Sequence, residues 1–451
     1  MRTVWLQEQR NAAIYAHVLA RHTTSTNTDK RNTKRFDALL TQCVKIDSVP
    51  PLRKTLRHAA RRHEIMPEKT TAWVLRKGED DGKPGHLEQD EVTLPELGES
   101  DCLVESIYGC WEGNMGHACS RKPIDICRQR GEDFVVIGNA GVVRILETGD
   151  RVTTVKKGDF ALLFCIGSRD KWGYPRTIFG YDAVGTIGLL AKRTVCREYQ
   201  VIPVPDTSRH SLKQWAAFSL RYITAWSNWH QAYGCWRVQM GVEDCPSPYV
   251  WGWGGGVTWA ELTLAKYSGA KVSMISGNPK RLRAIARAGM NPIDRRNFIN
   301  LDYNTQRYRN DPEYKKKYLE SEQIFLRTVQ ETTNGVGVSI FLDYVGSPVT
   351  RATIKALSRQ GLVSTAGWKE GMKISLVRAI ECINRHTHVH THYARYAQGR
   401  AAVQFAENTG WMPDDISEMD VYAFDEVPTL RQDYDAGKSS TYFPIYEVNK
   451  P

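Results

Sequence analysis

The spacing of apolar residues changes along this 451-residue chain and divides it into regions of different character. From residue 71 to about residue 205, short apolar runs are separated by Gly, Pro and Asp, a pattern typical of strands joined by turns. Strands are expected over residues 72–75, 102–107, 134–137, 141–146, 160–164 and 198–202. This part of the chain is therefore predicted to form a compact β-rich domain.

From residue 212 onward, helical and strand-like spacing alternate. Helices are expected over residues 212–219, 225–233, 260–267, 280–288, 314–332 and 349–358, and strands over 249–253, 271–275, 339–345 and 361–366. Such alternation builds a parallel sheet covered by helices. The tail beyond residue 395 has one expected helix, over 401–409, and then short extended runs. The pattern predicts an α/β protein with a doubly wound second domain.

The most informative segment joins an apolar strand to a helix through a glycine-rich turn. It reads Tyr249-Val250-Trp251-Gly252-Trp253-Gly254-Gly255-Gly256-Val257. Glycines let backbone amides approach a pyrophosphate, and the amino end of the following helix adds partial positive charge. A turn with a structural role alone is the alternative, and Thr258 follows where many such turns carry another glycine. We predict a dinucleotide site with Gly252, Gly254, Gly255, Gly256 and Val257 as binding residues.

The residues after the next strand indicate which dinucleotide binds. Ser276 directly follows that strand, where the residue that contacts the ribose is expected, and Lys280 and Arg281 come shortly after. An aspartate would repel a 2′-phosphate, whereas a small hydroxyl with two nearby cations favours it. We therefore predict NADP(H) rather than NAD(H), with Ser276, Lys280 and Arg281 around the 2′-phosphate.

Charge and cysteine usage narrow the function classes. Residues 1–65 hold 13 Lys and Arg against 5 Asp and Glu, so most of the net charge of +11 lies there and the rest is nearly neutral. A nucleic-acid partner is therefore not expected. No apolar run approaches the roughly 18 residues of a membrane span. Ten cysteines without a CxxC pair fit reduced thiols in a cytoplasmic enzyme.

The first 65 residues are expected to form a basic extension, flexible or outside the main fold. They contain a candidate helix over residues 12–21 and a basic run over 53–62. An arginine-rich leader for mitochondria is a minority alternative, which Glu8 and an early tryptophan argue against.

Several local motifs resemble the medium-chain dehydrogenase/reductase superfamily, and within it the crotonyl-CoA carboxylase/reductase group. The resemblance covers about residues 70–448 and is carried by residues 93–98, 137–143, 224–226, 251–257, 341–346 and 392–396, together with an insertion over 303–333. It implies a GroES-like β-rich catalytic domain over 66–222, a Rossmann domain over 223–390 and a C-terminal return over 391–451. It also implies that Thr224, Val345 and Gly346 line the cofactor and that the protein forms a homodimer or homotetramer.

The same resemblance allows the zinc-ligand motif of the superfamily to be compared with this sequence. Zinc alcohol dehydrogenases of the superfamily use a Cys, a Gly-His-Glu triplet and a third ligand, but here Gly138-Asn139-Ala140 replaces the triplet after Cys110. The closely spaced cysteines of a structural zinc lobe are also missing. We therefore predict zinc-independent chemistry, with Cys110 as a buried thiol.

Alternating histidines at positions 386, 388, 390 and 392 are the rival metal site. A strand would point all four the same way, but the outer two would lie roughly 20 Å apart, too far to share an ion. Adjacent pairs could still chelate; the alternative is a polar edge strand of which only His392 reaches the active site.

The group's reaction transfers hydride from NADPH to an enoyl thioester, after which the enolate takes CO2 or a proton. By motif, its CO2-holding residues correspond to Glu112, Asp182 and His392, which are the catalytic candidates. The group has an asparagine at the position of Glu112, and a carboxylate repels a developing carboxylate. Simple reduction, with Glu112 or His392 as proton donor, is therefore favoured over carboxylation.

Two other functions stay open. One is a zinc-free quinone, alcohol or carbonyl oxidoreductase that acts on a free small molecule and needs no CoA-binding surface. The other is a non-enzymatic member of the superfamily. Basic residues of the insertion, among them Lys315 and Lys316, fit either contacts with CoA phosphates or a solvated helix face.

Overall fold

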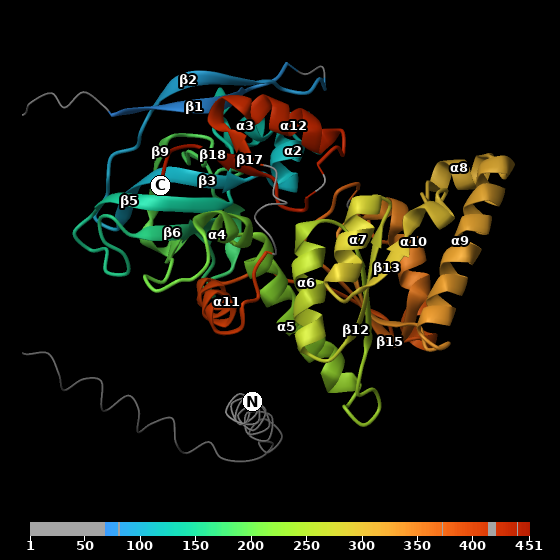
Figure 1. Cartoon of the computed structure of the whole chain (residues 1–451). Coiled ribbons are helices and arrows are strands. Elements are labelled where there is room, and N and C mark those ends of the chain that lie inside the picture. Colours follow the sequence, from blue (N-terminus) through green and yellow to red (C-terminus); the bar gives the residue numbers. More distant parts are fainter. Residues whose placement is uncertain (1–67, 80–81, 372, 414–420, 440) are drawn as a thin grey trace, which may run out of the picture. The chain divides into compact units, whose positions relative to one another are not determined.

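A computed structural model describes residues 68–79, 82–371, 373–413, 421–439 and 441–451 (Figure 1). The expected basic extension over residues 1–65, with its candidate helix, lies outside the described residues. In the part that is described, no helix combines the length and the apolar character that crossing a membrane requires.

The β-rich part is built around one sheet that is antiparallel except where β17 and β18 pair in parallel. Its strand order is β10-β6-β5-β3-β18-β17, and β9 also pairs with β3. The strands are β3 (Asp101–Cys110), β5 (Gly141–Thr148), β6 (Phe160–Leu163), β9 (Arg193–Arg197), β10 (Val201–Pro203), β17 (Val421–Ala423) and β18 (Ile445–Glu447). A smaller sheet has the order β2-β1-β4, and β7 (Ile166–Arg169) and β8 (Pro175–Ile178) form a hairpin. The small sheet consists of β1 (Lys69–Arg76), β2 (Leu87–Thr93) and β4 (Phe134–Val135).

Helices border these sheets and lead to the second half of the chain. They are α2 (Gly113–Ser120), α3 (Ile126–Arg130), α4 (Leu212–Phe218), α11 (Tyr396–Thr409) and α12 (Val427–Asp435). The long helix α5 (Arg221–Gln239) begins where the expected boundary between the domains lies. It then packs against α6 of the second half.

The second half contains a parallel sheet with the strand order β13-β12-β11-β14-β15-β16. Its strands are β11 (Tyr249–Trp253), β12 (Lys271–Ser276), β13 (Asn291–Asp294), β14 (Val338–Asp343), β15 (Leu357–Thr365) and β16 (His388–Thr391). In chain order this is the 3-2-1-4-5-6 arrangement of dinucleotide-binding sheets, whose order reverses between β11 and β14. The carboxyl ends of those two strands are therefore where a ligand is expected.

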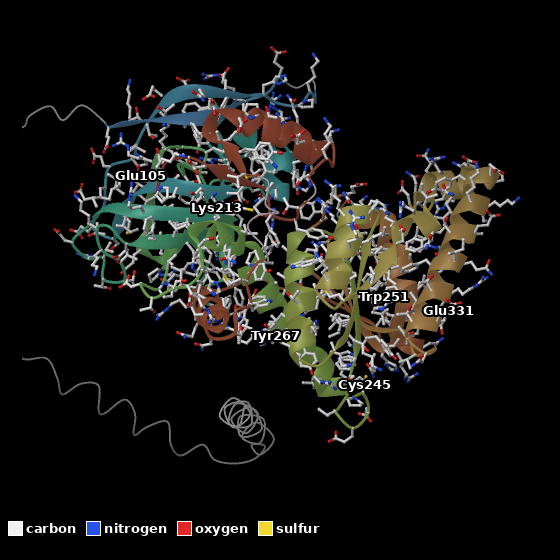
Figure 2. All side chains as sticks on the ribbon, viewed as in Figure 1. Glu105, Lys213, Cys245, Trp251, Tyr267 and Glu331 are labelled. Atoms are coloured by element: carbon white, nitrogen blue, oxygen red, sulfur yellow. The ribbon has the colours of Figure 1, made fainter. Side chains whose placement is uncertain are left out.

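Alternating side chains decide which helices cover which face of this sheet. Val250, Ile340 and Leu362 join the core with α5, α6 (Gly256–Tyr267) and α7 (Pro279–Arg287). Their neighbours Trp251, Phe341 and Val363 join the opposite core with α9 (Pro312–Thr332) and α10 (Ser347–Ala356) (Figure 1). Trp251 lies in the interior of this half (Figure 2), where its ring meets that of Phe325 from α9 edge to face. The insertion thus supplies a helix of the second layer, with α8 (Thr305–Asn310) ahead of it.

The last residues of the chain return to the first sheet. In β18, Ile445 and Tyr446 pair antiparallel with Cys110 and Gly109 of β3. Just before this strand, Tyr442 and Phe443 pack with residues of α5 and α6 in one core. The return therefore contacts both halves.

The predicted α/β class is confirmed. Several elements were not expected from the sequence, among them β9 and α12, which both carry many polar residues. The alternating histidines do not form one strand face, because His386 precedes β16 with a φ of +53° and breaks the extended backbone.

Candidate active site

The glycine-rich turn leaves no room for side chains at Gly254 and Gly256, beside the amino end of α6. Gly254 has a φ of +146°, in the region that favours glycine, and a Cβ there would lie 2.3 Å from the Thr258 hydroxyl oxygen. A Cβ on Gly256 would lie 2.6 Å from the Cδ of Arg221, whereas a Cβ on Gly255 would meet nothing within 4 Å. Thr258 fits the turn, because its hydroxyl donates a hydrogen bond to the Trp253 carbonyl over 3.3 Å. The open space at Gly255, beside the helix amino end, suits a phosphate.

Of the two cations expected at the 2′-phosphate, one is exposed to solvent and the other already donates hydrogen bonds within the protein. Ser276 ends β12, and the Asn278 side chain caps α7 by accepting from the Lys280 amide over 2.9 Å. The Lys280 side chain is exposed. Arg281 instead donates to the carbonyls of Ser439 and Thr441 over 3.1 and 3.0 Å and lies over the Tyr442 ring. Lys280 is therefore the cation that faces solvent here, while the C-terminal return holds Arg281.

The turn after β14 is fixed by backbone contacts. One carboxylate oxygen of Asp343 accepts from the amides of Val345 and Gly346, both over 3.0 Å. The Val345 carbonyl accepts from the amides of Lys369 and Glu370 over 3.1 and 2.8 Å. The carbonyl of Val345, a residue expected to line the cofactor, is thus already hydrogen-bonded within the protein. Thr224, the remaining cofactor candidate, lies in the first turn of α5.

A buried ion pair lies where the β-rich half meets α5. Glu112 follows β3 and is 5% exposed, and one of its carboxylate oxygens accepts from Arg221 Nε over 3.1 Å. The other guanidinium donors go to Cys110 Sγ over 3.1 Å, the Tyr442 carbonyl over 2.6 Å and the Trp111 carbonyl over 2.5 Å. Because Arg221 also contacts the glycine-rich turn, it connects that turn with Glu112.

Burial governs the protonation of Glu112. Loss of solvent raises the pKa of its carboxyl, and the nearby Arg221 offsets only part of this effect. Its second oxygen, both side-chain amide atoms of Asn139 and the Tyr446 hydroxyl are buried without a hydrogen-bond partner among the described residues. Buried polar atoms are normally paired, so these groups are suited to a polar substrate atom or an ordered water.

His392 is held as a neutral acceptor. The side-chain amide oxygen Oε1 of Gln398 accepts from the Arg395 backbone amide over 2.9 Å and lies 3.1 Å from His392 Nε2. Because that oxygen can only accept, Nε2 must carry the hydrogen, which leaves Nδ1 as the acceptor. Burial lowers the pKa of the imidazole below its ordinary value, so the ring is neutral at pH 7.

Asp182 lies in the turn after β8, where its carboxylate accepts from the Ile178 amide over 2.5 Å. Glu112, Asp182 and His392 thus each have a different hydrogen-bond partner. The charges of Glu112 and Asp182 also act on two further side chains, Cys165 and Tyr393. The charge of Glu112 raises the pKa of Cys165, after the larger effect of burial, and both Cys165 and Asp182 act in the same way on Tyr393. Tyr393 belongs to the segment over residues 392–396 that carries the resemblance, whereas Cys165 was not expected from the sequence.

A cavity of about 900 Å³ lies beside this site. Its walls include Trp259 and Lys266 of α6, Arg281 of α7, and Tyr442. The three catalytic candidates do not line it, whereas Arg281 and the C-terminal return do.

Solved structures with the same arrangement are carboxylase/reductases and alcohol dehydrogenases. The crotonyl-CoA carboxylase/reductase AntE in complex with NADP is 21% identical, with a TM-score of 0.70 over 89% of this chain and 98% of that chain. The 2-octenoyl-CoA carboxylase reductase CinF in complex with NADP and 2-octenoyl-CoA is 19% identical, with a TM-score of 0.68 over 84% and 88%. The fold is that of the medium-chain dehydrogenases and reductases. The alcohol dehydrogenase of Aeropyrum pernix shares it at 20% identity, with a TM-score of 0.63 over 84% of this chain and 99% of that one. No family profile and no curated protein matches the sequence.

The zinc site considered from the sequence resemblance is not supported by the residues present, whose chemistry does not fit that ion. Cys110 Sγ accepts a hydrogen bond from the Arg221 guanidinium, so a fixed cation already lies beside the expected ligand. Burial raises the pKa of this thiol well above its ordinary value, which disfavours the thiolate that zinc requires. Among the described residues, no group of three His, Cys, Asp or Glu side chains is placed to hold a metal ion.

Sequence reasoning missed Arg221, although the chain carried a signal for it. Arg221 is the one charged residue in the otherwise apolar run from Trp215 to Ile223. An arginine in such a run is rarely fully buried unless it is paired. Its partner Glu112 is 109 positions away, so the pair itself could not be assigned.

Proposed function

We propose that this protein is an NADPH-dependent, zinc-independent reductase that transfers hydride to an activated C=C bond of an enoyl thioester such as an enoyl-CoA. The observation that carries the proposal is a buried acid, Glu112, connected through Arg221 to the glycine-rich turn. The likeness to carboxylase/reductases solved in complex with NADP and with 2-octenoyl-CoA supports the cofactor and the substrate class.

The chemistry divides between cofactor and protein. NADPH supplies a hydride to the β-carbon, and the electron pair of the double bond moves toward the thioester oxygen. The Glu112 carboxyl then gives its proton to the α-carbon. Arg221 stabilises the carboxylate that remains until solvent returns the proton. His392, neutral and with Nδ1 as acceptor, is suited to orient the substrate rather than to donate a proton.

Glu112→Gln tests this assignment. We expect the rate of NADPH oxidation with crotonyl-CoA to fall roughly 10²-fold or more, because glutamine has no proton to transfer. In the unchanged protein, the rate should fall as pH rises through the raised pKa of Glu112, and the variant should lose that dependence. Stopped-flow absorbance of the nicotinamide band measures both. A variant that kept the same pH profile would rule out Glu112 as the donor.

Carboxylation is not part of the proposal. CO2 and the Glu112 proton would compete for the same α-carbon of the enolate: protonated Glu112 supplies the proton there, and ionised Glu112 would repel a developing carboxylate. Mass spectrometry of the product with and without bicarbonate decides the point. A saturated acyl-CoA supports the proposal, and an added carboxyl group would contradict it.

A second candidate is a zinc-free oxidoreductase for a free carbonyl, alcohol or quinone. The alcohol dehydrogenases among the structural neighbours favour it, since they share the fold and not the CoA substrate. NADPH binding without oxidation by any CoA ester, but with oxidation by a free enone or aldehyde, would select this alternative.

Cofactor choice is tested at Lys280. We expect Lys280→Ala to weaken NADPH binding roughly tenfold and to leave NADH binding unchanged, because the exposed ammonium faces the 2′-phosphate in the proposed complex. Arg283, exposed one turn further along α7, is the matched control, and Arg283→Ala should leave both affinities unchanged. Equal losses for the two cofactors in K280A would place the 2′-phosphate elsewhere.

The assembly and location of the protein remain predictions. We propose a homodimer or homotetramer, which light scattering coupled to size-exclusion chromatography measures directly. A cytoplasmic location is proposed on the same footing. It fits the free thiols of the cysteines in the described part of the chain.

A further inference from the structure

An acidic side chain is buried beneath the junction of β11, β14 and β15. Glu261 lies in the second turn of α6 and is completely buried. One of its oxygens accepts from the Tyr344 hydroxyl over 2.7 Å. The other lies 3.4 Å from the Ser364 hydroxyl, and Asn228 Nδ2 is 3.5 Å from both. The four side chains come from α6, α5 and the ends of β14 and β15.

The carboxyl of Glu261 has no cationic partner in this cluster of described side chains. The groups that face Glu261 are Asn228 from α5, Tyr344 after β14 and Ser364 from β15, and Tyr344 alone among them titrates. In the described part of the chain, no Lys, Arg or His forms an ion pair with Glu261. Burial raises the pKa of its carboxyl to about 8, although the hydrogen bonds from Tyr344, Asn228 and Ser364 act in the opposite direction. The group therefore changes charge near physiological pH.

The cluster adjoins the glycine-rich turn. A Cβ on Gly254 would lie 2.9 Å from the Cβ of Tyr344, and the Tyr344 amide donates to the Trp253 carbonyl over 3.2 Å. Tyr344 also immediately precedes Val345 and Gly346, the turn expected on the nicotinamide side. Asn228 lies one helical turn after Thr224. Glu261 is thus hydrogen-bonded to a residue, Tyr344, that packs directly against the glycine-rich turn.

We propose that Glu261 is a positioning residue that acts through Tyr344 and its own charge to favour the oxidised, cationic nicotinamide over the reduced, neutral one. This inference rests on the proposed NADPH-dependent function. An ionised carboxylate attracts a positive ring and is indifferent to a neutral one, and the absence of a paired cation leaves that attraction uncompensated. By linkage, binding of NADP⁺ favours loss of the Glu261 proton, so the preference for NADP⁺ grows as pH rises.

Binding measurements on the full chain test the proposal without turnover. The dissociation constants of NADPH and NADP⁺ are measured by titration calorimetry between about pH 6 and about pH 10. In the unchanged protein, the affinity for NADP⁺ relative to NADPH should rise roughly tenfold as pH passes about 8. Glu261→Gln keeps the size of the side chain but cannot ionise, so its ratio should stay at the low-pH value throughout.

Two further variants separate this effect from a structural one. Tyr344→Phe removes a hydrogen bond that lowers the pKa of Glu261, so the midpoint should move to higher pH. Glu322, a buried carboxylate paired with Arg351 and Lys355 in the second layer, is the matched control, and Glu322→Gln should follow the unchanged protein. A pH-dependent ratio that persists in E261Q, or a flat ratio in the unchanged protein, would overturn the inference. If the unchanged protein bound neither cofactor, the proposed function would fail, and this inference with it.

Discussion

Replacing Arg221 by leucine is expected to lower the free energy of unfolding by about 3–5 kcal/mol, the usual cost of removing one partner of a buried ion pair. Arg221 is 3% exposed, and its guanidinium reaches Glu112, Cys110 and two backbone carbonyls. Leucine would leave the Glu112 carboxyl and those acceptors without their donor. Chemical denaturation followed by tryptophan fluorescence measures the loss.

The stability of Arg221→Leu is compared with that of two control variants. Arg296 forms an ion pair with Asp294 at the surface, so Arg296→Leu should cost less than about 1 kcal/mol. The double variant with Arg221→Leu and Glu112→Leu should recover part of the stability, because it removes the carboxylate that the single variant leaves unpaired. If R221L cost no more than R296L, the pair would not hold the two halves as described.

Two adjacent glycines are expected to respond differently to alanine. Gly254→Ala should lose stability by about 1–3 kcal/mol, because its φ of +146° is strained for alanine and its Cβ would lie 2.3 Å from the Thr258 hydroxyl. The turn would have to shift, so NADPH affinity should fall roughly 100-fold or more.

Gly255→Ala is the matched variant. Its Cβ meets no atom within 4 Å, so the stability should stay close to that of the unchanged protein. The added methyl group would instead occupy the space proposed for the phosphate, and the affinity for NADPH should still fall. Calorimetric titration and thermal unfolding together separate the two effects. Wild-type affinity in both variants would place the pyrophosphate away from this turn.

Local patterns predicted the parts of the molecule that local forces determine. Val250 and Trp251 alternate between the two faces of the sheet because consecutive strand residues point opposite ways, and their apolar run predicted β11. The glycine-rich turn was readable for the same reason, since its backbone conformation depends on the residues within it. By contrast, β9 has arginine at both ends and forms through its pairing with β3, which no local pattern contains.

The chemistry of the site depended on contacts between distant positions. Arg281 was expected at a 2′-phosphate from its place after β12, but it donates hydrogen bonds to the carbonyls of Ser439 and Thr441 instead. Glu112 was identified as a candidate from its motif, whereas its protonation follows from burial and from Arg221. Asn228 and Ser364, which surround Glu261, are 136 positions apart. Pairings over such distances are fixed by the complete fold.

The antiparallel pairing of β18 with β3 also affects the order in which parts of the protein can fold during synthesis. On the ribosome, β3 emerges early, and its neighbour β18 is made only after all six strands of the parallel sheet have been translated. The nascent chain therefore has the parallel sheet available before the first sheet has its full set of strands. Until Tyr442 and Phe443 leave the exit tunnel, Arg221 and Gly256 also lack their contacts with the C-terminal return, so the proposed site is completed only after the parallel sheet has been made.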